Sequence, residues 1–153
     1  MEYKIRRAVP ADEQRIRELF IEMLNAIYHT QDVKGYETGY LDKYWTQGED
    51  AVYVAEDNDV VAYLAVEVHR EGEKEYVYLD DLSVAEKYRS QGIGSALIHE
   101  AEGYAKDIGI QHILFHVEKS NTKAFQLYER LGYKVYRDDG NRYMMIRKQE
   151  IIL

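Results

Sequence analysis

The sequence predicts one α/β (α+β) domain, residues 1–153, built on a mixed, mostly antiparallel sheet of about seven strands. Two observations carry this prediction. In the first half of the chain, strand-like runs are separated by tight turns, which is typical of antiparallel hairpins. After residue 84 the order becomes helix, strand, helix, strand, which indicates a βαβ unit with one parallel strand pair. The length of 153 residues suits a single core.

Turn and cap residues delimit the elements of the first half. Pro10 ends the first strand, and the acidic residues that follow it are typical of the start of a helix. Asp57-Asn58-Asp59 is expected to form a hairpin turn. The expected elements are, in chain order, a strand at 3–9, a helix from Pro10 to about Ile27, a helix at 39–45, and strands at 51–55, 60–68 and 77–84.

Glycines placed directly after helices organise the second half. Gly109 and Gly132 each follow a helical apolar pattern, as C-terminal caps should. Asp138 to Asn141 form a second expected hairpin turn. The expected elements are helices at 92–108 and 121–131 and strands at 110–117, 133–137 and 142–148.

Composition excludes several classes of protein. The net charge of −8 argues against a nucleic-acid partner, although an acidic surface would suit cationic ligands or simple solubility. No apolar run approaches 18 residues and no signal pattern begins the chain, so we expect no membrane partner and a cytoplasmic location. The chain has no cysteine, which excludes disulfides and cysteine metal sites. His112 and His116 would lie about 13 Å apart on a strand, so no metal is expected.

A glycine loop between a strand and a helix is the clearest functional feature. Arg89-Ser-Gln-Gly92-Ile-Gly94-Ser95 would expose backbone N–H groups at the positive end of a helix, which is a cradle for phosphate. The loop has no Gly-Lys-Ser/Thr, so it is not a Walker A motif. Leu97 occupies the place of the third Rossmann glycine.

A second motif follows one helix and one strand later: Asn121-x-x-Ala-x-x-Leu-Tyr128-x-x-x-Gly132-Tyr133. Together with Arg89-x-x-Gly92-x-Gly94, it resembles the paired signatures of the GNAT superfamily of acetyl-CoA-dependent N-acetyltransferases. The resemblance covers roughly residues 77–135. It implies a GNAT-like sheet with helices on both faces and acetyl-CoA as cosubstrate. It also implies that the strand ending at Val84 and the strand 110–117 run parallel but splay apart.

The resemblance also implies how the coenzyme is held. The loop N–H groups would bind its pyrophosphate, and its pantetheine arm would enter the split beside the first of these strands. The backbone N–H of Leu82 would polarise the thioester carbonyl. The implied acetyl-CoA contacts are Leu82, Ser83, Val84, Arg89, Ser90, Gln91, Gly92, Ile93, Gly94, Ser95, Asn121, Ala124 and Tyr128.

Acetyl transfer also needs a proton donor for the departing thiolate and a neutral amine. The resemblance implies Tyr128 as the donor, although a tyrosine on the inner face of an amphipathic helix is also an ordinary core residue. Asn121 is expected to touch the coenzyme, to cap its helix, or both. Asp80 and Asp81 are candidates to bind or deprotonate the amine, and Asp80 resembles the acid of polyamine and some aminoglycoside acetyltransferases. A solvated acid is the alternative for Asp80, and Glu67 is a rival base.

Aromatic residues precede the sheet and suit an organic cation. Tyr36, Tyr40 and Tyr44 would share one helix face beside Trp45. Core packing of that helix is the alternative. The favoured acceptor is a small primary amine such as a polyamine or amino-sugar. A protein N-terminus or lysine, and a non-catalytic acyl-CoA-binding regulator, remain open. The apolar tail Ile151-Ile-Leu153 leaves a homodimer open.

Overall fold

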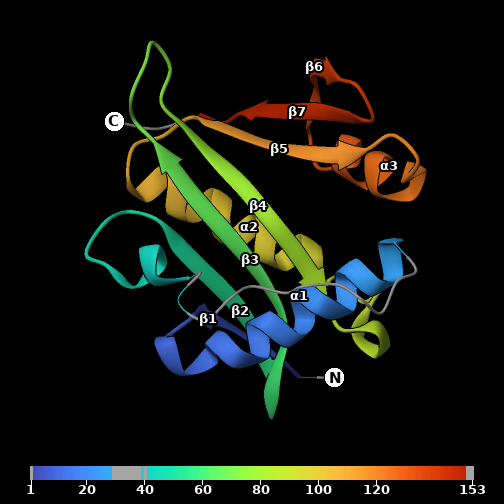
Figure 1. The fold of residues 1–153 in the computed structure, drawn as a ribbon. Coiled ribbons are helices and arrows are strands. Elements are labelled where there is room, and N and C mark those ends of the chain that lie inside the picture. Colours follow the sequence, from blue (N-terminus) through green and yellow to red (C-terminus); the bar gives the residue numbers. More distant parts are fainter. Residues whose placement is uncertain (1, 29–38, 40, 151–153) are drawn as a thin grey trace. The chain divides into compact units, whose positions relative to one another are not determined.

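The computed structural model describes residues 2–28, 39 and 41–150. Within them, seven strands form one sheet in the order β1-β2-β3-β4-β5-β7-β6 (Figure 1). Strand β4 pairs with β5 in parallel, whereas β1–β2, β2–β3, β5–β7 and β6–β7 are antiparallel. This confirms the predicted mixed sheet. The strands are β1 (Lys4–Arg7), β2 (Ala51–Asp57), β3 (Asp59–His69), β4 (Tyr76–Val84), β5 (His112–Glu118), β6 (Lys134–Asp139) and β7 (Arg142–Lys148).

Three α-helices and three short 3₁₀ turns complete the described elements. They are η1 (Pro10–Asp12), α1 (Glu13–Tyr28), η2 (Asp42–Trp45), η3 (Glu86–Tyr88), α2 (Ile93–Asp107) and α3 (Thr122–Arg130). None of these helices is long and apolar enough to cross a membrane. By contacts, the chain divides into a first unit, residues 1–67 and 81–101, and a second unit, residues 68–80 and 102–153.

In the first unit, helices cover both faces of the strands. The Ser83 hydroxyl donates to the carbonyl of Leu19 in α1 at 3.1 Å. The neighbouring Leu82 lies beside Gly94 of α2 instead, 3.6 Å from where a Cβ would stand there. Because successive strand residues face opposite sides of a sheet, α1 and α2 lie on opposite faces, as Figure 1 shows. Fully buried side chains such as Ile16, Tyr63 and Leu97 fill the layers.

In the second unit, β5 is central, with β7 and then β6 beside it. Phe115 packs its ring against Tyr128 of α3 and against Tyr133, with ring centroids 4.5 and 4.7 Å apart. Ile113 and Met145 are fully buried. A buried carboxylate also joins the layers, because Glu102 accepts hydrogen bonds from the Tyr133 hydroxyl at 2.8 Å and from Arg147 at 2.7 Å.

Both predicted helix caps are confirmed. Ile110 N–H reaches back five residues to the carbonyl of Ala105, and Tyr133 N–H reaches back to that of Tyr128. This is the Schellman arrangement that a glycine after the last helical turn permits. The expected helix at 39–45 was wrong, because Asp42–Trp45 form only a single 3₁₀ turn. Residues 36 and 40 lie outside the described part of the chain.

Candidate active site

The glycine loop of the first unit leads from η3 into α2, and its conformation is unusual. Ser90 and Gly92 have φ angles of 61° and 85°, in the left-handed region that favours glycine. Residues 89–92 are exposed to solvent. The first intrahelical hydrogen bond of α2 runs from Ala96 N–H to the carbonyl of Gly92 at 3.0 Å. The three N–H groups at positions 93–95 therefore precede the helical ladder and are available to an anion at the positive helix end.

The polar side chains of the loop hold its own backbone. Arg89 donates from Nε to the carbonyl of Val84 at 2.9 Å, and its Nη2 lies 3.8 Å from a carboxylate oxygen of Glu22 in α1. Gln91 donates to the carbonyl of Lys87 at 3.1 Å. These contacts tie the loop to the end of β4 and to α1. The geometry therefore favours backbone N–H groups, rather than these side chains, as the anion ligands.

The two glycines of the loop, Gly92 and Gly94, meet different structural requirements. A Cβ at Gly92 would meet nothing within 4 Å, so only its positive φ disfavours a side chain. Gly94 lies inside α2, and a Cβ there would make ordinary contact with Leu82. The loop thus needs glycine at position 92 for backbone shape.

The end of strand β4 carries the expected acids and the backbone that is expected to contact the coenzyme. Burial alternates at Val77 and Leu79, but residues 80–82 are all half-buried. Ser83 is buried and its hydroxyl is bound to α1. Its backbone, rather than its hydroxyl, is therefore the part suited to a ligand. Asp80 belongs to the second unit and Asp81 to the first.

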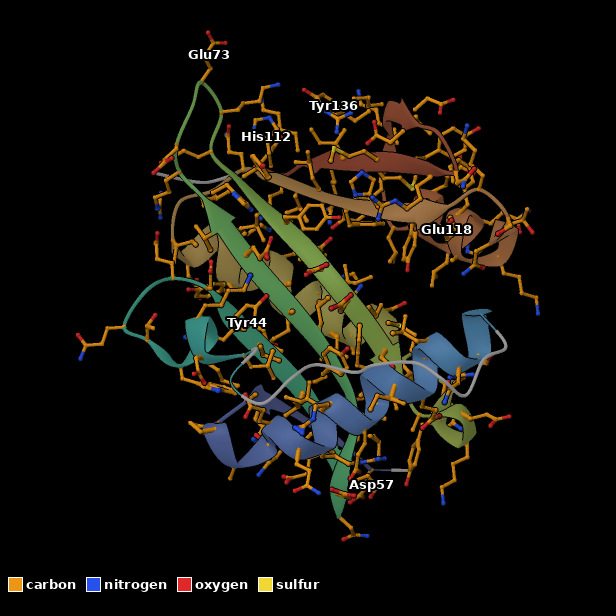
Figure 2. All side chains as sticks on the ribbon, viewed as in Figure 1. Tyr44, Asp57, Glu73, His112, Glu118 and Tyr136 are labelled. Carbon is orange, nitrogen blue, oxygen red and sulfur yellow. The ribbon has the colours of Figure 1, made fainter. Side chains whose placement is uncertain are left out.

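Glu67, the rival base, is engaged in an ion pair. Its carboxylate accepts from Lys43 Nζ at 2.7 Å, and only 22% of the Glu67 side chain is exposed. Tyr44, beside Lys43 in η2, is 5% exposed and is buried within the first unit (Figure 2). Tyr44 is thus a core residue, as the packing alternative held, whereas Tyr36 and Tyr40 lie outside the described residues.

Helix α3 of the second unit positions both predicted motif residues. The Asn121 side chain caps the helix by accepting from Ala124 N–H at 3.2 Å. Tyr128 stands two turns later, with its ring edge-on to Phe115. Burial raises the pKa of the Tyr128 hydroxyl above its ordinary value. The phenol therefore stays protonated at neutral pH, which suits a proton donor.

A chain of polar groups in the second unit was missed from the sequence. The Tyr78 hydroxyl lies 2.6 Å from His116 Nδ1, and His116 Nε2 lies 2.8 Å from Asp139 Oδ2. Arg137 donates to both oxygens of Asp139, at 2.7 and 3.0 Å. Only the register of β4, β5 and β6 brings these residues together, and the sequence contains no local signal for that register.

Comparisons with known proteins agree with this geometry. The sequence model of the Acetyltransferase (GNAT) family matches residues 15–133. Streptothricin acetyltransferase of Streptomyces lavendulae is 30% identical over 92 residues, covering 57% of this chain and 48% of that protein. The N-terminal acetyltransferase B complex catalytic subunit NAA20 of Arabidopsis thaliana is 31% identical over 97 residues, covering 61% of this chain and 56% of that protein. The chain thus spans about half the length of these relatives.

A solved structure extends the likeness to the whole fold. The PaiA N-acetyltransferase of Thermoplasma acidophilum, in complex with coenzyme A, superposes with a TM-score of 0.77 at 22% identity. The match covers 97% of this chain and 99% of that one. At this identity the likeness concerns the fold, which agrees with the sheet order and the three helices described above.

Proposed function

The chain belongs to the acetyltransferase (GNAT) family, and we propose that it transfers an acetyl group from acetyl-CoA to a primary amine. One observation carries the proposal. The N–H groups at the start of α2 follow an exposed, left-handed turn at Gly92, in the register of the family's pyrophosphate loop. A helix N-terminus with unpaired N–H groups is a site for phosphate.

The remaining coenzyme contacts would come from the end of β4 and from α3. The backbone of Leu82, Ser83 and Val84 would pair with the pantetheine arm, and the Leu82 N–H would stabilise the oxyanion. The engaged hydroxyl of Ser83 supports a role for its backbone alone. Asn121 already caps α3, so any contact with the coenzyme adds to that role.

Tyr128 would protonate the departing thiolate. Its fixed place against Phe115 supports this role, and the phenol, whose pKa is raised by burial, carries at neutral pH the proton that a donor needs. Half-buried Asp80 or Asp81 would attract the ammonium group of the acceptor, because a carboxylate attracts a cation.

The favoured acceptor is a small-molecule amine, such as a polyamine or an amino-sugar. The acidic pair on β4, the net charge of −8 and the likeness to streptothricin acetyltransferase support it. The likeness to an N-terminal acetyltransferase subunit favours a second candidate, a protein N-terminus. Small-molecule amines and protein N-termini differ in size, because a protein acceptor site must admit several peptide residues beyond the amine.

A direct test mixes the purified chain with acetyl-CoA and measures release of free thiol. The acceptors are spermidine, glucosamine and a hexapeptide with a free N-terminus. Faster release with spermidine or glucosamine supports a small-molecule enzyme, whereas faster release with the hexapeptide supports the second candidate. Binding of acetyl-CoA without release of free coenzyme A thiol in the presence of any of these acceptors would contradict the proposal and favour a non-catalytic acyl-CoA-binding regulator.

A further inference from the structure

The short 3₁₀ turn η3, which leads from the end of β4 into the glycine loop, is held by two other elements of the first unit. Glu22 of α1 accepts a hydrogen bond from the backbone N–H of Glu86 at 3.1 Å. The Tyr88 hydroxyl donates to Asp57 at 3.1 Å, and Asp57 ends β2 at the hairpin to β3 (Figure 2). Both contacts reach η3 from parts of the chain that are distant in sequence, so they fix the position of the turn.

The Glu22 carboxylate makes two contacts through a single oxygen. Its Oε1 accepts from the Glu86 N–H and lies 3.8 Å from Nη2 of Arg89. The N–H at the start of a helical turn has no partner within the turn, so an acidic side chain there acts as a cap. The side chains of Glu22 and Arg89 are 39% and 42% exposed, and water screens an ion pair of that kind. The hydrogen bond to Glu86 is therefore the stronger of the two contacts.

The residues that follow η3 adopt a backbone conformation that needs support. Ser90 has a φ of 61°, which is disfavoured for any residue that carries a Cβ. Such a conformation persists where the surrounding structure holds it in place. Arg89, directly before Ser90, is held by the carbonyl of Val84 at 2.9 Å and lies beside Glu22. The contacts that fix η3 thus act immediately before the left-handed turn.

The same turn arranges the backbone N–H groups at positions 93–95, which precede the helical ladder of α2. A ligand binds more weakly when part of its affinity is spent on ordering a loop, so a loop that is already ordered binds more tightly. Helix α1 holds the end of β4 as well, because the Ser83 hydroxyl donates to the carbonyl of Leu19, one turn before Glu22. Helix α1 therefore supports both the strand and the turn that lead into the loop.

We propose that Glu22 and Tyr88 are positioning residues of the coenzyme site, and this inference rests on the binding of acetyl-CoA proposed above. They hold η3 so that the N–H groups at positions 93–95 are arranged for the pyrophosphate before acetyl-CoA binds. Neither side chain touches the coenzyme in this scheme. Glu22 acts through the Glu86 N–H, and Tyr88 acts by fixing its own place in η3.

The charge of Glu22 gives the proposal a test of sign. Glu22 places a negative charge beside a loop that would bind an anion. If only this charge mattered, its removal would strengthen acetyl-CoA binding, because like charges repel. If Glu22 positions η3, its removal weakens acetyl-CoA binding instead. The direction of the change in affinity therefore decides between the two effects.

The first test titrates the whole chain with acetyl-CoA in a calorimeter. Glu22→Ala should weaken binding about three- to tenfold, as expected for the loss of one net hydrogen bond. Glu22→Gln keeps an oxygen that can accept from Glu86 and loses only the charge beside Arg89, so its affinity should stay within about twofold of the wild type. The matched control is Glu18→Ala, because Glu18 lies one turn earlier in α1 and pairs with Arg15 of the same helix. The control should bind acetyl-CoA like the wild type.

Tyr88→Phe tests the second contact by removing only the hydroxyl that reaches Asp57. We expect acetyl-CoA to bind about three- to tenfold more weakly, again as for one net hydrogen bond. Tyr136→Phe is the control, because it removes a hydroxyl from an exposed tyrosine of the second unit. This variant also keeps the proposal testable if Glu22→Ala does not fold.

Steady-state kinetics separate positioning from general damage to the fold. In Glu22→Ala and Tyr88→Phe, KM for acetyl-CoA should rise about as much as the affinity falls, and kcat at saturating acetyl-CoA should be kept. A smaller fraction of folded enzyme would instead lower kcat and leave KM unchanged. That second pattern would contradict the proposal.

The calorimetric outcomes also distinguish this inference from the proposed function. If the wild type does not bind acetyl-CoA, the proposed function fails and the positioning role fails with it. If the wild type binds, and Glu22→Ala and Tyr88→Phe bind as tightly as their controls or more tightly, only the positioning role fails. A loss of affinity in one variant alone would support the role of that residue and overturn the role of the other.

Discussion

The two units make their candidate sites from different materials. In the first unit, the loop before α2 offers backbone N–H groups, and its polar side chains, Arg89 and Gln91, are occupied in holding the loop. In the second unit, the candidate chemistry lies in side chains, namely Tyr128 on α3 and the chain from Tyr78 to Asp139. A backbone site depends on conformation, and a side-chain site depends on register and packing. The two should therefore respond to different substitutions.

The largest expected effect is a loss of turnover caused by a substitution in the second unit. Tyr128→Phe removes the hydroxyl but keeps the ring that packs against Phe115. We expect kcat to fall about 10²-fold or more, since a general acid contributes that much. Acetyl-CoA affinity should not change, because the loop of the first unit is untouched. Steady-state thiol release and calorimetric titration measure the two quantities.

The control for this substitution is Tyr136→Phe, which removes a hydroxyl from a tyrosine that is 50% exposed. It should leave both kcat and affinity at wild-type values. A Tyr128→Phe variant with unchanged kcat would remove Tyr128 from the acid role. Weakened acetyl-CoA binding in that variant would instead show that Tyr128 contributes to coenzyme binding as well as to turnover.

The next effect is on stability, again through side chains. Glu102 accepts from Tyr133 and Arg147 while its own side chain is 8% exposed. Glu102→Gln takes away the charge opposite Arg147, whose side chain is 33% exposed and so partly screened by water. We expect a loss of about 1–3 kcal/mol in the free energy of unfolding. Urea denaturation measures it.

Glu100→Gln is the matched control, because Glu100 is an exposed acid in the same helix. Its free energy of unfolding should stay within about 0.5 kcal/mol of the wild type, as for most surface substitutions. Equal losses in the two variants would show that the bonds to Tyr133 and Arg147 contribute little.

A smaller effect is expected on the backbone site of the first unit. Gly92→Ala meets no atom within 4 Å, so its cost is the positive φ alone, roughly 1–2 kcal/mol. If the loop relaxes to relieve that strain, acetyl-CoA should bind roughly tenfold more weakly while kcat at saturation is kept. Gly94→Ala, at a helical position, should change affinity less. The reverse order would mean that close approach of the ligand, rather than backbone shape, requires the glycines.

The contrast between backbone and side chains also explains what the sequence could predict. Strand and helix order, the two glycine caps and the glycine loop before α2 follow from local patterns, because each is set by a few neighbouring residues. Residues 39–45 were predicted as a helix, but their local sequence pattern does not distinguish an α-helix from a short 3₁₀ turn with one buried ring.

The Tyr78–His116–Asp139 chain could not be predicted, because it depends on long-range register. The parallel ladder must align Tyr78 with Leu114 so that His116 lies within reach. On the other side, the register of β6 on β7 shifts between Val135 and Arg137, and the Asp139 carboxylate at the end of β6 reaches His116 of β5. No residue near His116 in the sequence indicates either event. The spacing of His116 from His112 raised only the question of a shared metal, which their separation on a strand excluded.

The smallest expected effect measures how much stability a non-glycine residue loses at a positive φ, which is the cost expected for Gly92→Ala. Gly103 and Gly109 both have open space where a Cβ would stand, but Gly103 lies inside α2 and Gly109 has a φ of 80°. Gly103→Ala should therefore stabilise the chain by about 0.5–1 kcal/mol, since alanine restricts the unfolded chain and suits a helix. Gly109→Ala should destabilise it by roughly 1 kcal/mol, from the left-handed backbone alone. Urea denaturation of both variants gives the difference directly. Two shifts of the same sign would show that the positive φ costs little, and weaker coenzyme binding by Gly92→Ala would then need a cause other than backbone shape.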